Sequence, residues 1–316
     1  MYNRGFTDVK NIKALVGNSE SVVFYRNVGG IGDAVMIVPS ITAYRKQYGK
    51  DVKMIVATVS YCLPVFYNNP DVDYIVNTDQ FKSTMDCRIF FEYIGSLFIQ
   101  LSDPCPCSIY ESSHEPLILK SRQELFAEAC GVEFLIENNR MFVSDLDNKI
   151  AKKSVGYDKY IVVHCSSNSK FRSLPHAHVD YLVKYLAKRL NPIGVVLISH
   201  DWKYKYSKYD NVTRVISSPM NHIIAIINNS IGLIGPDSMG VHVAGALGIP
   251  SYGIFGMTDP KCRMLYDKAG WYSGYHRCKK QHCWYHPCLF RFCLNAINIK
   301  DVAEKFLTFL GGYNEL

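Results

Sequence analysis

The sequence predicts an α/β protein made of two Rossmann-like lobes that face each other. Three observations indicate this fold. Short apolar runs alternate with segments of helical periodicity in both halves, a glycine-rich turn follows the first apolar run, and a polar segment separates the halves. At 316 residues the chain is longer than a typical single domain, so two domains with a core each are expected.

The first half contains a strand, a glycine-rich loop, a helix and a second strand, which we assign to residues 21–25 (SVVFY), 27–33, 34–48 and 53–57 (KMIVA). This βαβ unit implies a parallel sheet with right-handed crossovers. A helix is also expected at residues 121–130, because Ser121 can cap its start and Gly131 follows its end. Residues 80–115 show no clear pattern and are assigned to loop and short elements.

The segment 145–158 is polar, charged and poor in large apolar residues, so it is the best candidate for a linker. The alternation then restarts with strands at 160–164 (YIVVH), 194–199 and 251–255 and helices starting near Pro175 and Ser238. We therefore predict domains at residues 1–150 and 151–299, and a C-terminal helix within residues 300–316 that packs back on the first domain.

Lys and Arg total 35 against 28 Asp and Glu, and the net charge of +7 favours an anionic partner. Nucleic acid, a phosphorylated glycolipid and a nucleotide-sugar all qualify. No apolar run approaches the length that spans a bilayer, and the N-terminus lacks the apolar core of a secretory signal. A protein that stays in the cytoplasm is the expectation.

The first glycine loop contains Gly29, Gly30 and Gly32 between a predicted strand and helix. Glycines let the backbone turn tightly there, and a helix N-terminus offers N–H groups to an anion. The loop lacks the third glycine of the dinucleotide fingerprint, which argues against a nicotinamide cofactor. Asp33 either caps the helix or faces a ligand at the carboxyl end of the strand, and its position alone does not separate these interpretations.

The strongest active-site signal is the stretch 233–242 (LIGPDSMGVH), in which a strand ends at Gly-Pro and a helix of small residues follows. The small residues and the helix dipole suit a diphosphate. Polar and cationic residues also follow the strand at 160–164. The candidate ligand-binding residues of both loops are Ser166, Ser167, Lys170, Arg172, Asp237, Ser238, Met239, Gly240 and His242. Capping by Asp237 or Ser238 and a structural histidine are the alternatives.

The stretches 29–45, 164–175 and above all 235–260 (GPDSMGVHVAGALGIPSYGIFGMTDP) resemble glycosyltransferase family nine, the ADP-heptose:lipopolysaccharide heptosyltransferase family. The resemblance implies a GT-B fold, with the acceptor on the N-terminal lobe and a nucleotide diphosphate-sugar donor on the C-terminal lobe across a central cleft. It also implies inverting transfer without a catalytic metal.

The same resemblance implies that Asp33 is the general base and that Lys170 contacts the donor phosphate. It implies a diphosphate-sugar loop formed by Asp237, Ser238, Gly240 and His242. The family usually has glycine directly after Asp-Ser or Asp-Thr, whereas this chain has Met239 at that place. Asp71-Val72-Asp73 has the spelling of a metal-binding D-x-D pair, but it follows Asn69-Pro70, so we interpret it as a turn.

Cys278, Cys283, Cys288 and Cys293 are spaced C-x4-C-x4-C-x4-C. Four thiolates suit tetrahedral zinc or iron, and His276, His282 or His286 could replace a cysteine. Some members of the resembling family have a C-terminal cysteine motif, including protein-modifying heptosyltransferases with an iron-binding role. We expect a structural metal in a small cysteine-rich segment, with unliganded buried thiols as the alternative.

The acceptor could be a lipopolysaccharide core, a protein side chain or a modified DNA base, and the sequence does not distinguish them. A different class of function, a non-catalytic module that binds a nucleotide-sugar, would keep the loop at 235–242 but would have no use for Asp33.

Overall fold

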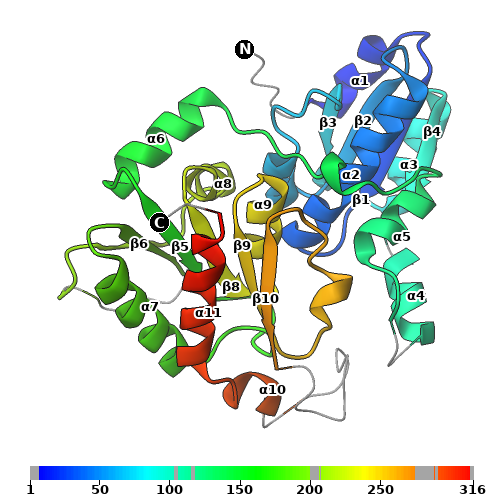
Figure 1. Cartoon of the computed structure of the whole chain (residues 1–316). Coiled ribbons are helices and arrows are strands. Elements are labelled where there is room, and N and C mark those ends of the chain that lie inside the picture. The colour runs from blue at the N-terminus through cyan, green and yellow to red at the C-terminus, as the bar shows by residue number, and fades with distance from the viewer. Residues whose placement is uncertain are drawn as a thin grey trace. The chain divides into compact units, whose positions relative to one another are not determined.

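The structure, a computed structural model, describes residues 7–102, 106–114, 118–199, 206, 208–274, 288 and 291–313. The chain forms two compact units, Met1–Ser144 and Asp145–Leu316 (Figure 1). Each unit has its own sheet, in which all the strand pairs are parallel. This arrangement confirms the predicted α/β fold with parallel sheets.

The first unit has a four-stranded sheet in the order β3-β2-β1-β4. Its strands are β1 (Ser21–Arg26), β2 (Lys53–Thr58), β3 (Tyr74–Asn77) and β4 (Ser96–Gln100). The side chains of α1 (Val9–Val16) and α3 (Thr84–Tyr93) pack with Val23 and Tyr25 of β1. Phe24 lies between Val23 and Tyr25 in β1 and so points to the opposite face of the sheet. There it contacts Tyr44 of α2 (Ile31–Tyr48), and α5 (Arg122–Ala129) packs on α2. Because helices cover both faces, β1 is buried along its whole length.

The second unit has a six-stranded sheet in the order β10-β9-β8-β5-β6-β7. Numbered within this unit, the order is six-five-four-one-two-three, which is the strand order of the Rossmann fold. The strands are β5 (Tyr160–His164), β6 (Gly194–Ile198), β7 (Val212–Val215), β8 (Gly232–Pro236), β9 (Ser251–Phe255) and β10 (Ala269–Ser273). The helices are α6 (Asp145–Val155), α7 (His176–Leu190), α8 (Met220–Asn228), α9 (Met239–Ala246), α10 (Phe292–Asn295) and α11 (Ile299–Gly311).

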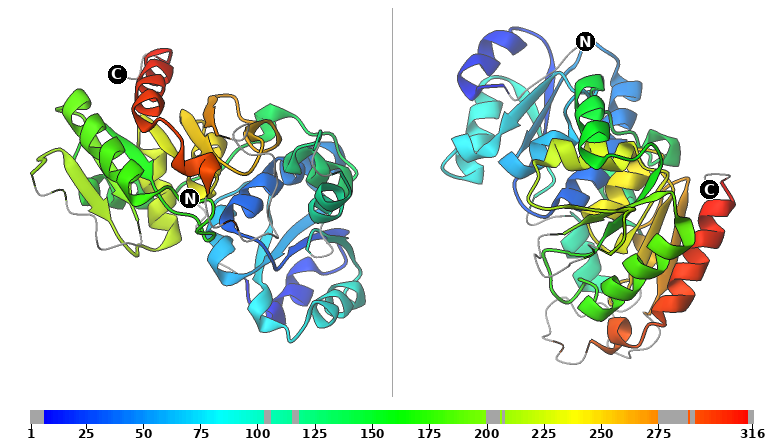
Figure 2. Two further views of the ribbon diagram at one scale, coloured as in Figure 1. Left: turned by 90° about the horizontal axis from the view of Figure 1, so that it is seen from below. Right: turned by 90° about the vertical axis from the view of Figure 1, so that its left-hand side faces the viewer.

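The C-terminal helix α11 lies beside α7, as both views in Figure 2 show. Val302, Phe306 and Leu310 of α11 are buried in the same apolar cluster as Leu182 and Leu186 of α7. The apolar side of this helix is therefore part of the core of the second unit. The expected packing of residues 300–316 on the first domain stays a prediction.

The segment 80–115 holds more regular structure than the sequence suggested. It contains α3, β4 and α4 (Pro106–His114). Ser83 caps α3 by accepting a hydrogen bond from the Asp86 N–H at 3.1 Å, and Cys87 and Phe91 are its buried positions. The strand β4 forms by pairing with β1, whose partner residues lie 75 positions away, as Ser21 and Ser96 do. A strand that depends on such distant pairing leaves little local signal.

The interpretation of residues 145–158 as a linker was wrong, because most of this segment forms α6. The helix buries Ala151 and Val155. Its polar residues have partners on or directly after α8: the Asn221 side chain donates to Asp147 at 2.9 Å, and the Asn228 and Asn229 side chains donate to Asn148. A polar helix–helix interface thus produced the composition that resembled a linker.

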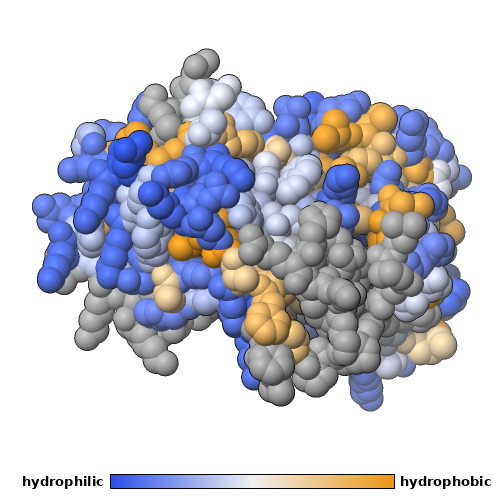
Figure 3. Space-filling model, turned by 60° about the horizontal axis from the view of Figure 1, so that its bottom comes forward, coloured by the Kyte–Doolittle hydropathy of each residue, from blue (hydrophilic) through white to orange (hydrophobic). Residues whose placement is uncertain are grey.

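Among the described helices, none combines the length and the apolar character that crossing a membrane requires. On the face drawn in Figure 3, apolar side chains form separate patches among polar ones.

Candidate active site

The strand order of each sheet defines where a ligand can bind. In an open parallel sheet, ligands bind at the carboxyl ends of the strands, where the order reverses direction. The reversal lies between β1 and β4 in the first unit and between β5 and β8 in the second. The predicted site residues Asp33 and Asp237 belong to the segments that leave β1 and β8, so each lies at its unit's reversal point.

The glycine loop, residues 27–33, connects β1 to α2. Gly29 has a φ of +87°, a conformation that favours glycine, and a Cβ there would lie 2.7 Å from an Asp33 carboxylate oxygen. Gly30 is the N-cap of α2 in extended conformation, and Gly32 lies in the first helical turn. The loop is thus shaped so that Asp33, also in this turn, can fold back over it.

Two hydrogen bonds and a further ion pair hold the Asp33 carboxylate. The Gly30 N–H donates to its Oδ2 at 3.0 Å, Arg26 Nη2 lies 3.6 Å from Oδ2, and Arg122 Nη1 donates to Oδ1. Burial would raise the pKa of Asp33, but Arg122, Arg26 and the Gly30 N–H together hold it well below its ordinary value of 3.8. The capping interpretation of Asp33 is therefore correct in part: the carboxylate closes a capping box and also forms ion pairs.

Arg26, Arg122 and Glu111 were not identified from the sequence. Arg26 ends β1, directly before the glycine loop, and Arg122 begins α5, directly after the predicted cap Ser121. Glu111, on α4, pairs with Arg122. A cation at the end of a strand that leads into a glycine loop was the available signal. No local signal pointed to Arg122 or Glu111.

In the second unit, residues 166–173 form the loop after β5. Four of these eight residues are serines, so we call it the serine loop. Ser173 closes it, because its Oγ accepts from the Ser167 N–H at 2.9 Å and its N–H donates to the Ser169 carbonyl at 3.1 Å. Lys170 is exposed on this loop and, within the described residues, forms no ion pair or hydrogen bond. Its ammonium group is thus available to a ligand.

The serine loop is fixed to the start of α9 at two points. Ser238 Oγ donates to the Ser166 carbonyl at 2.9 Å, and Arg172 Nη1 donates to the Asp237 carbonyl at 3.0 Å. Ser238 occupies the N-cap position, yet its side chain makes no capping hydrogen bond. The alternative interpretation, in which the Ser238 side chain caps α9, is therefore wrong, because its hydroxyl holds the neighbouring loop instead.

Glycines bring α9 close to β5. A Cβ on Gly235 would lie 2.6 Å from the His164 carbonyl oxygen, and a Cβ on Gly240 would lie 2.8 Å from His164 Nδ1. Met239, where the family usually has glycine, is the first helical residue and is half-buried. The first turn of α9 contains no acidic residue, so nothing on it repels an anion.

Asp237 and His242 are almost fully buried, with 3% and 2% of each residue exposed. Thr258 Oγ1 donates to Asp237 Oδ2 at 2.8 Å, and His242 Nε2 lies 3.6 Å from Oδ1. Burial would raise the pKa of Asp237, but the hydrogen bond from His242 and the charges of Arg172 and Arg263 keep it well below 3.8. These two side chains brace the start of α9 from inside the unit.

Of the predicted metal ligands, Cys278 and Cys283 lie outside the described residues. Cys293 is buried, and the half-buried Cys288 accepts a hydrogen bond from the Arg291 N–H at 3.3 Å. Within the described parts of the chain, no three potential ligands lie together. The D-x-D pair is structural: Asp71 accepts from Thr42 at 2.8 Å, and Asp73 pairs with Arg45 at 2.5 Å.

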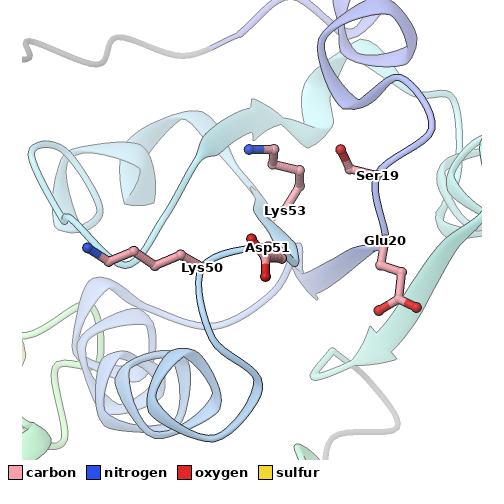
Figure 4. A pocket seen from close by; sticks show the side chains of 5 residues that line it. All are labelled: Ser19, Glu20, Lys50, Asp51 and Lys53. Atoms are coloured by element: carbon pink, nitrogen blue, oxygen red, sulfur yellow. The ribbon is translucent and has the colours of Figure 1, made fainter.

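A separate pocket of about 380 Å³ is lined by Ser19, Glu20, Lys50, Asp51 and Lys53 (Figure 4). It lies where β1 and β2 begin, at Ser21 and Lys53, so it is at the opposite strand ends from Asp33. This pocket is therefore not part of the candidate site.

The family model for glycosyltransferase family 9 (heptosyltransferase) matches residues 108–291, which is more than half of the chain. The chain belongs to glycosyltransferase family 9. The matched range includes the serine loop and α9, together with Glu111 and Arg122, but it does not include Asp33.

Solved structures of bacterial glycosyltransferases share the fold. ADP-heptose lipopolysaccharide heptosyltransferase II of E. coli superposes with a TM-score of 0.66 at 13% identity, over 93% of this chain and 99% of that one. A family 9 glycosyl transferase of Veillonella parvula gives 0.67 at 14%, over 93% and 97%. The iron-containing dodecameric glycosyltransferase TibC of enterotoxigenic E. coli gives 0.63 at 13%, over 92% and 77%. A comparison with curated protein sequences finds no match.

Acid should destabilise this family 9 chain partly through Asp33 and Asp237. A carboxyl group whose folded pKa is lowered stabilises the protein fully above its unfolded pKa, and this contribution is lost as the pH falls toward the folded pKa. We expect the free energy of unfolding to fall steeply below about pH 4. Asp33→Asn and Asp237→Asn should each weaken the pH dependence of the free energy of unfolding, by an amount that corresponds to roughly one bound proton at most. Urea unfolding from pH 7 to 3 measures it, and equal slopes in all three proteins would contradict this role.

Proposed function

We propose that the chain is an inverting glycosyltransferase that moves a sugar from a nucleotide diphosphate donor to a hydroxyl of a larger acceptor. The observation that carries the proposal is the second reversal point. There, a helix start with no side-chain cap, an exposed lysine and a hydrogen-bonded serine loop come together at the carboxyl ends of β5 and β8. Membership in glycosyltransferase family 9 supports it.

The donor diphosphate binds, in this proposal, to the first-turn N–H groups of α9 and to the serine loop. N–H groups at a helix start and a nearby cation favour an anion. Lys170 and Arg172 then neutralise the charge that develops on the leaving diphosphate. Two E. coli WaaC heptosyltransferase structures of the same fold contain ADP and ADP-2-deoxy-2-fluoro heptose, so an ADP-sugar is the first donor to test.

Asp33 acts as the general base. It takes the proton of the acceptor hydroxyl, whose oxygen attacks the anomeric carbon from the face opposite the nucleotide, and the single displacement inverts that carbon. Its side chain is 15% exposed, against 4% for Asp237, so Asp33 is the more accessible of the two carboxylates. Arg26 and Arg122 keep Asp33 ionised at neutral pH, so it has a free position for a proton, while the lowered pKa makes it a weaker base than an ordinary carboxylate.

The acceptor supplies the hydroxyl that attacks the sugar. A lipopolysaccharide core is the first candidate because of the family, and a protein side chain and a modified DNA base are the others. The net charge of +7 favours an anionic acceptor without distinguishing these. We place the reaction in the cytoplasm, with the first unit binding the acceptor.

Replacing Asp33 with Asn should lower turnover by about 10² to 10⁴-fold, because general-base assistance is typically worth that much. Donor affinity should change little, since Asp33 belongs to the other unit. ADP release from ADP-heptose with heptose-free lipopolysaccharide core measures turnover, and calorimetric titration measures donor affinity. Weaker donor binding with unchanged turnover would exclude the role as base. Donor binding without transfer or hydrolysis in the wild type would favour the non-catalytic module.

Replacing Lys170 with Ala should weaken donor binding and also slow the chemical step, because the lysine neutralises charge that grows in the transition state. Thermal shift with ADP-heptose reports the binding part: a ligand at 100 times its dissociation constant adds about 2.7 kcal/mol of stability. Lys300→Ala, which removes an exposed lysine of α11, is the matched control. An equal effect in both variants would contradict the contact with the diphosphate.

We also propose that the cysteine-rich segment holds structural zinc or iron. The described half of the site fits: the Arg291 N–H donates to the Cys288 sulfur, and Cys293 is buried nearby in the sequence. Four protein ligands would leave no position for substrate, so transfer should continue in the presence of EDTA. Elemental analysis of reduced protein should find one metal per chain. A clearly lower content would contradict the site, and immediate loss of turnover on adding EDTA would contradict its structural role.

A further inference from the structure

Arg122 lies between two carboxylates of the first unit. Its Nη1 contacts Asp33 Oδ1, while its Nε and Nη2 donate to the two oxygens of Glu111, both at 2.8 Å. The pairing with Glu111 is bidentate, which fixes the plane of the guanidinium group as well as its position. Glu111 thereby holds the edge of the guanidinium group that carries Nε and Nη2, and the third nitrogen, Nη1, is directed at Asp33.

The four charged groups of this cluster come from four separate elements and balance one another. Arg26 ends β1, Asp33 starts α2, Glu111 lies on α4 and Arg122 starts α5. Their side chains are between 7% and 20% exposed. Charges so far from water are costly unless each is paired, so removing one member leaves its neighbours uncompensated.

The two arginines are held in different ways. Arg26 Nη1 donates to the Leu101 carbonyl at 2.5 Å, and its guanidinium lies 5.1 Å from the Phe126 ring centre. These contacts fix Arg26 to backbone and core. Arg122 instead depends on an ionisable partner, Glu111, for its direction.

We propose that Arg122 is a positioning residue for Asp33 and that Glu111 sets the direction of Arg122. This inference rests on the proposed role of Asp33 as the base. With Arg26 and the Gly30 N–H on Oδ2 and Arg122 on Oδ1, the carboxylate is restricted to one orientation. A base held in one orientation loses less freedom when the acceptor hydroxyl arrives.

Two other titratable groups near Asp33, among the described residues, do not add charge at neutral pH. Tyr61 and Cys62 lie on the 3₁₀ helix Ser60–Val65. Burial raises the pKa of Cys62 to about 12, and burial also raises the pKa of Tyr61. Both therefore stay neutral in the working range, and the ionisation of Asp33 is governed by Arg122 and Arg26, with Glu111 as the opposing charge one step further away.

The test uses Arg122→Gln, Arg122→Lys and Glu111→Gln, with Arg45→Gln as the matched control. Arg45 also pairs with a carboxylate, that of Asp73 at 2.5 Å, and its side chain is only 10% exposed, but it lies near the other end of α2. Its loss should cost comparable stability without affecting Asp33. The first measurement is carbon-13 NMR of the Asp33 carboxyl carbon over pH, assigned by its loss in Asp33→Asn. The second is the pH dependence of kcat/KM for ADP release from ADP-heptose with heptose-free lipopolysaccharide core.

In Arg122→Gln, the Asp33 resonance should titrate at least about one pH unit higher than in the wild type, because an opposite charge at contact typically lowers a carboxyl pKa by that much or more. The acid limb of kcat/KM should move in the same direction, and kcat should fall by about 10 to 100-fold. Arg122→Lys keeps the positive charge but not the bidentate guanidinium geometry. It should therefore restore the wild-type titration of the Asp33 resonance but only part of kcat. Glu111→Gln should lower kcat without moving the limb upward. KM for ADP-heptose should be unchanged throughout.

An Asp33 resonance that titrates in Arg122→Gln as in the wild type would overturn the inference, as would an equal change in Arg45→Gln. Full kcat in Glu111→Gln would overturn the part assigned to Glu111. The inference and the proposed function fail separately: if Asp33→Asn is inactive while Arg122→Gln behaves like the wild type, only the inference is wrong. If Asp33→Asn keeps full turnover, the proposed base is wrong and the inference falls with it.

Discussion

Parallel pairing between strands that are not consecutive in the chain, β1 with β4 and β5 with β8, is the constraint on which the rest depends. It makes the strand order of each sheet reverse, and it places the segments that follow β1 and β8 at the carboxyl ends of central strands. Side chains and loop backbone at such an edge can meet a ligand while the apolar strands below stay buried. The glycine loop, the serine loop and the start of α9 all follow from this arrangement.

Both units use a carboxylate to organise this edge, but in different ways. Asp237 is surrounded by Thr258, His242 and Arg172 and is almost fully buried, so it stabilises the loop from which α9 starts. Asp33 is held by arginines and a backbone N–H yet stays partly exposed. Both carboxylates are ionised at neutral pH, but the enclosed one gives rigidity to a binding loop, whereas the partly exposed one can be reached by a proton donor. This difference is the physical basis for assigning structure to one and chemistry to the other.

The sequence predicted what local pattern controls. The strands β1 and β5 are covered on both faces or deeply buried, so they appear as short apolar runs, and Gly29 and Ser121 mark a turn and a helix start that need those residue types. What it could not predict depends on distant contacts. The polar helix α6 resembles a linker until its partners beside α8 are known. The contact between Asp33 and Arg122 joins residues 89 positions apart, so no spacing rule reveals it.

The central claim is that the start of α9 and the serine loop bind the diphosphate of an activated sugar. A crystal structure of the full chain soaked with ADP tests it most directly. We expect phosphate oxygens within hydrogen-bond distance of the N–H groups of Met239 and Gly240, with Lys170 turned toward them. ADP bound at another part of the chain, with the start of α9 free of phosphate, would contradict it.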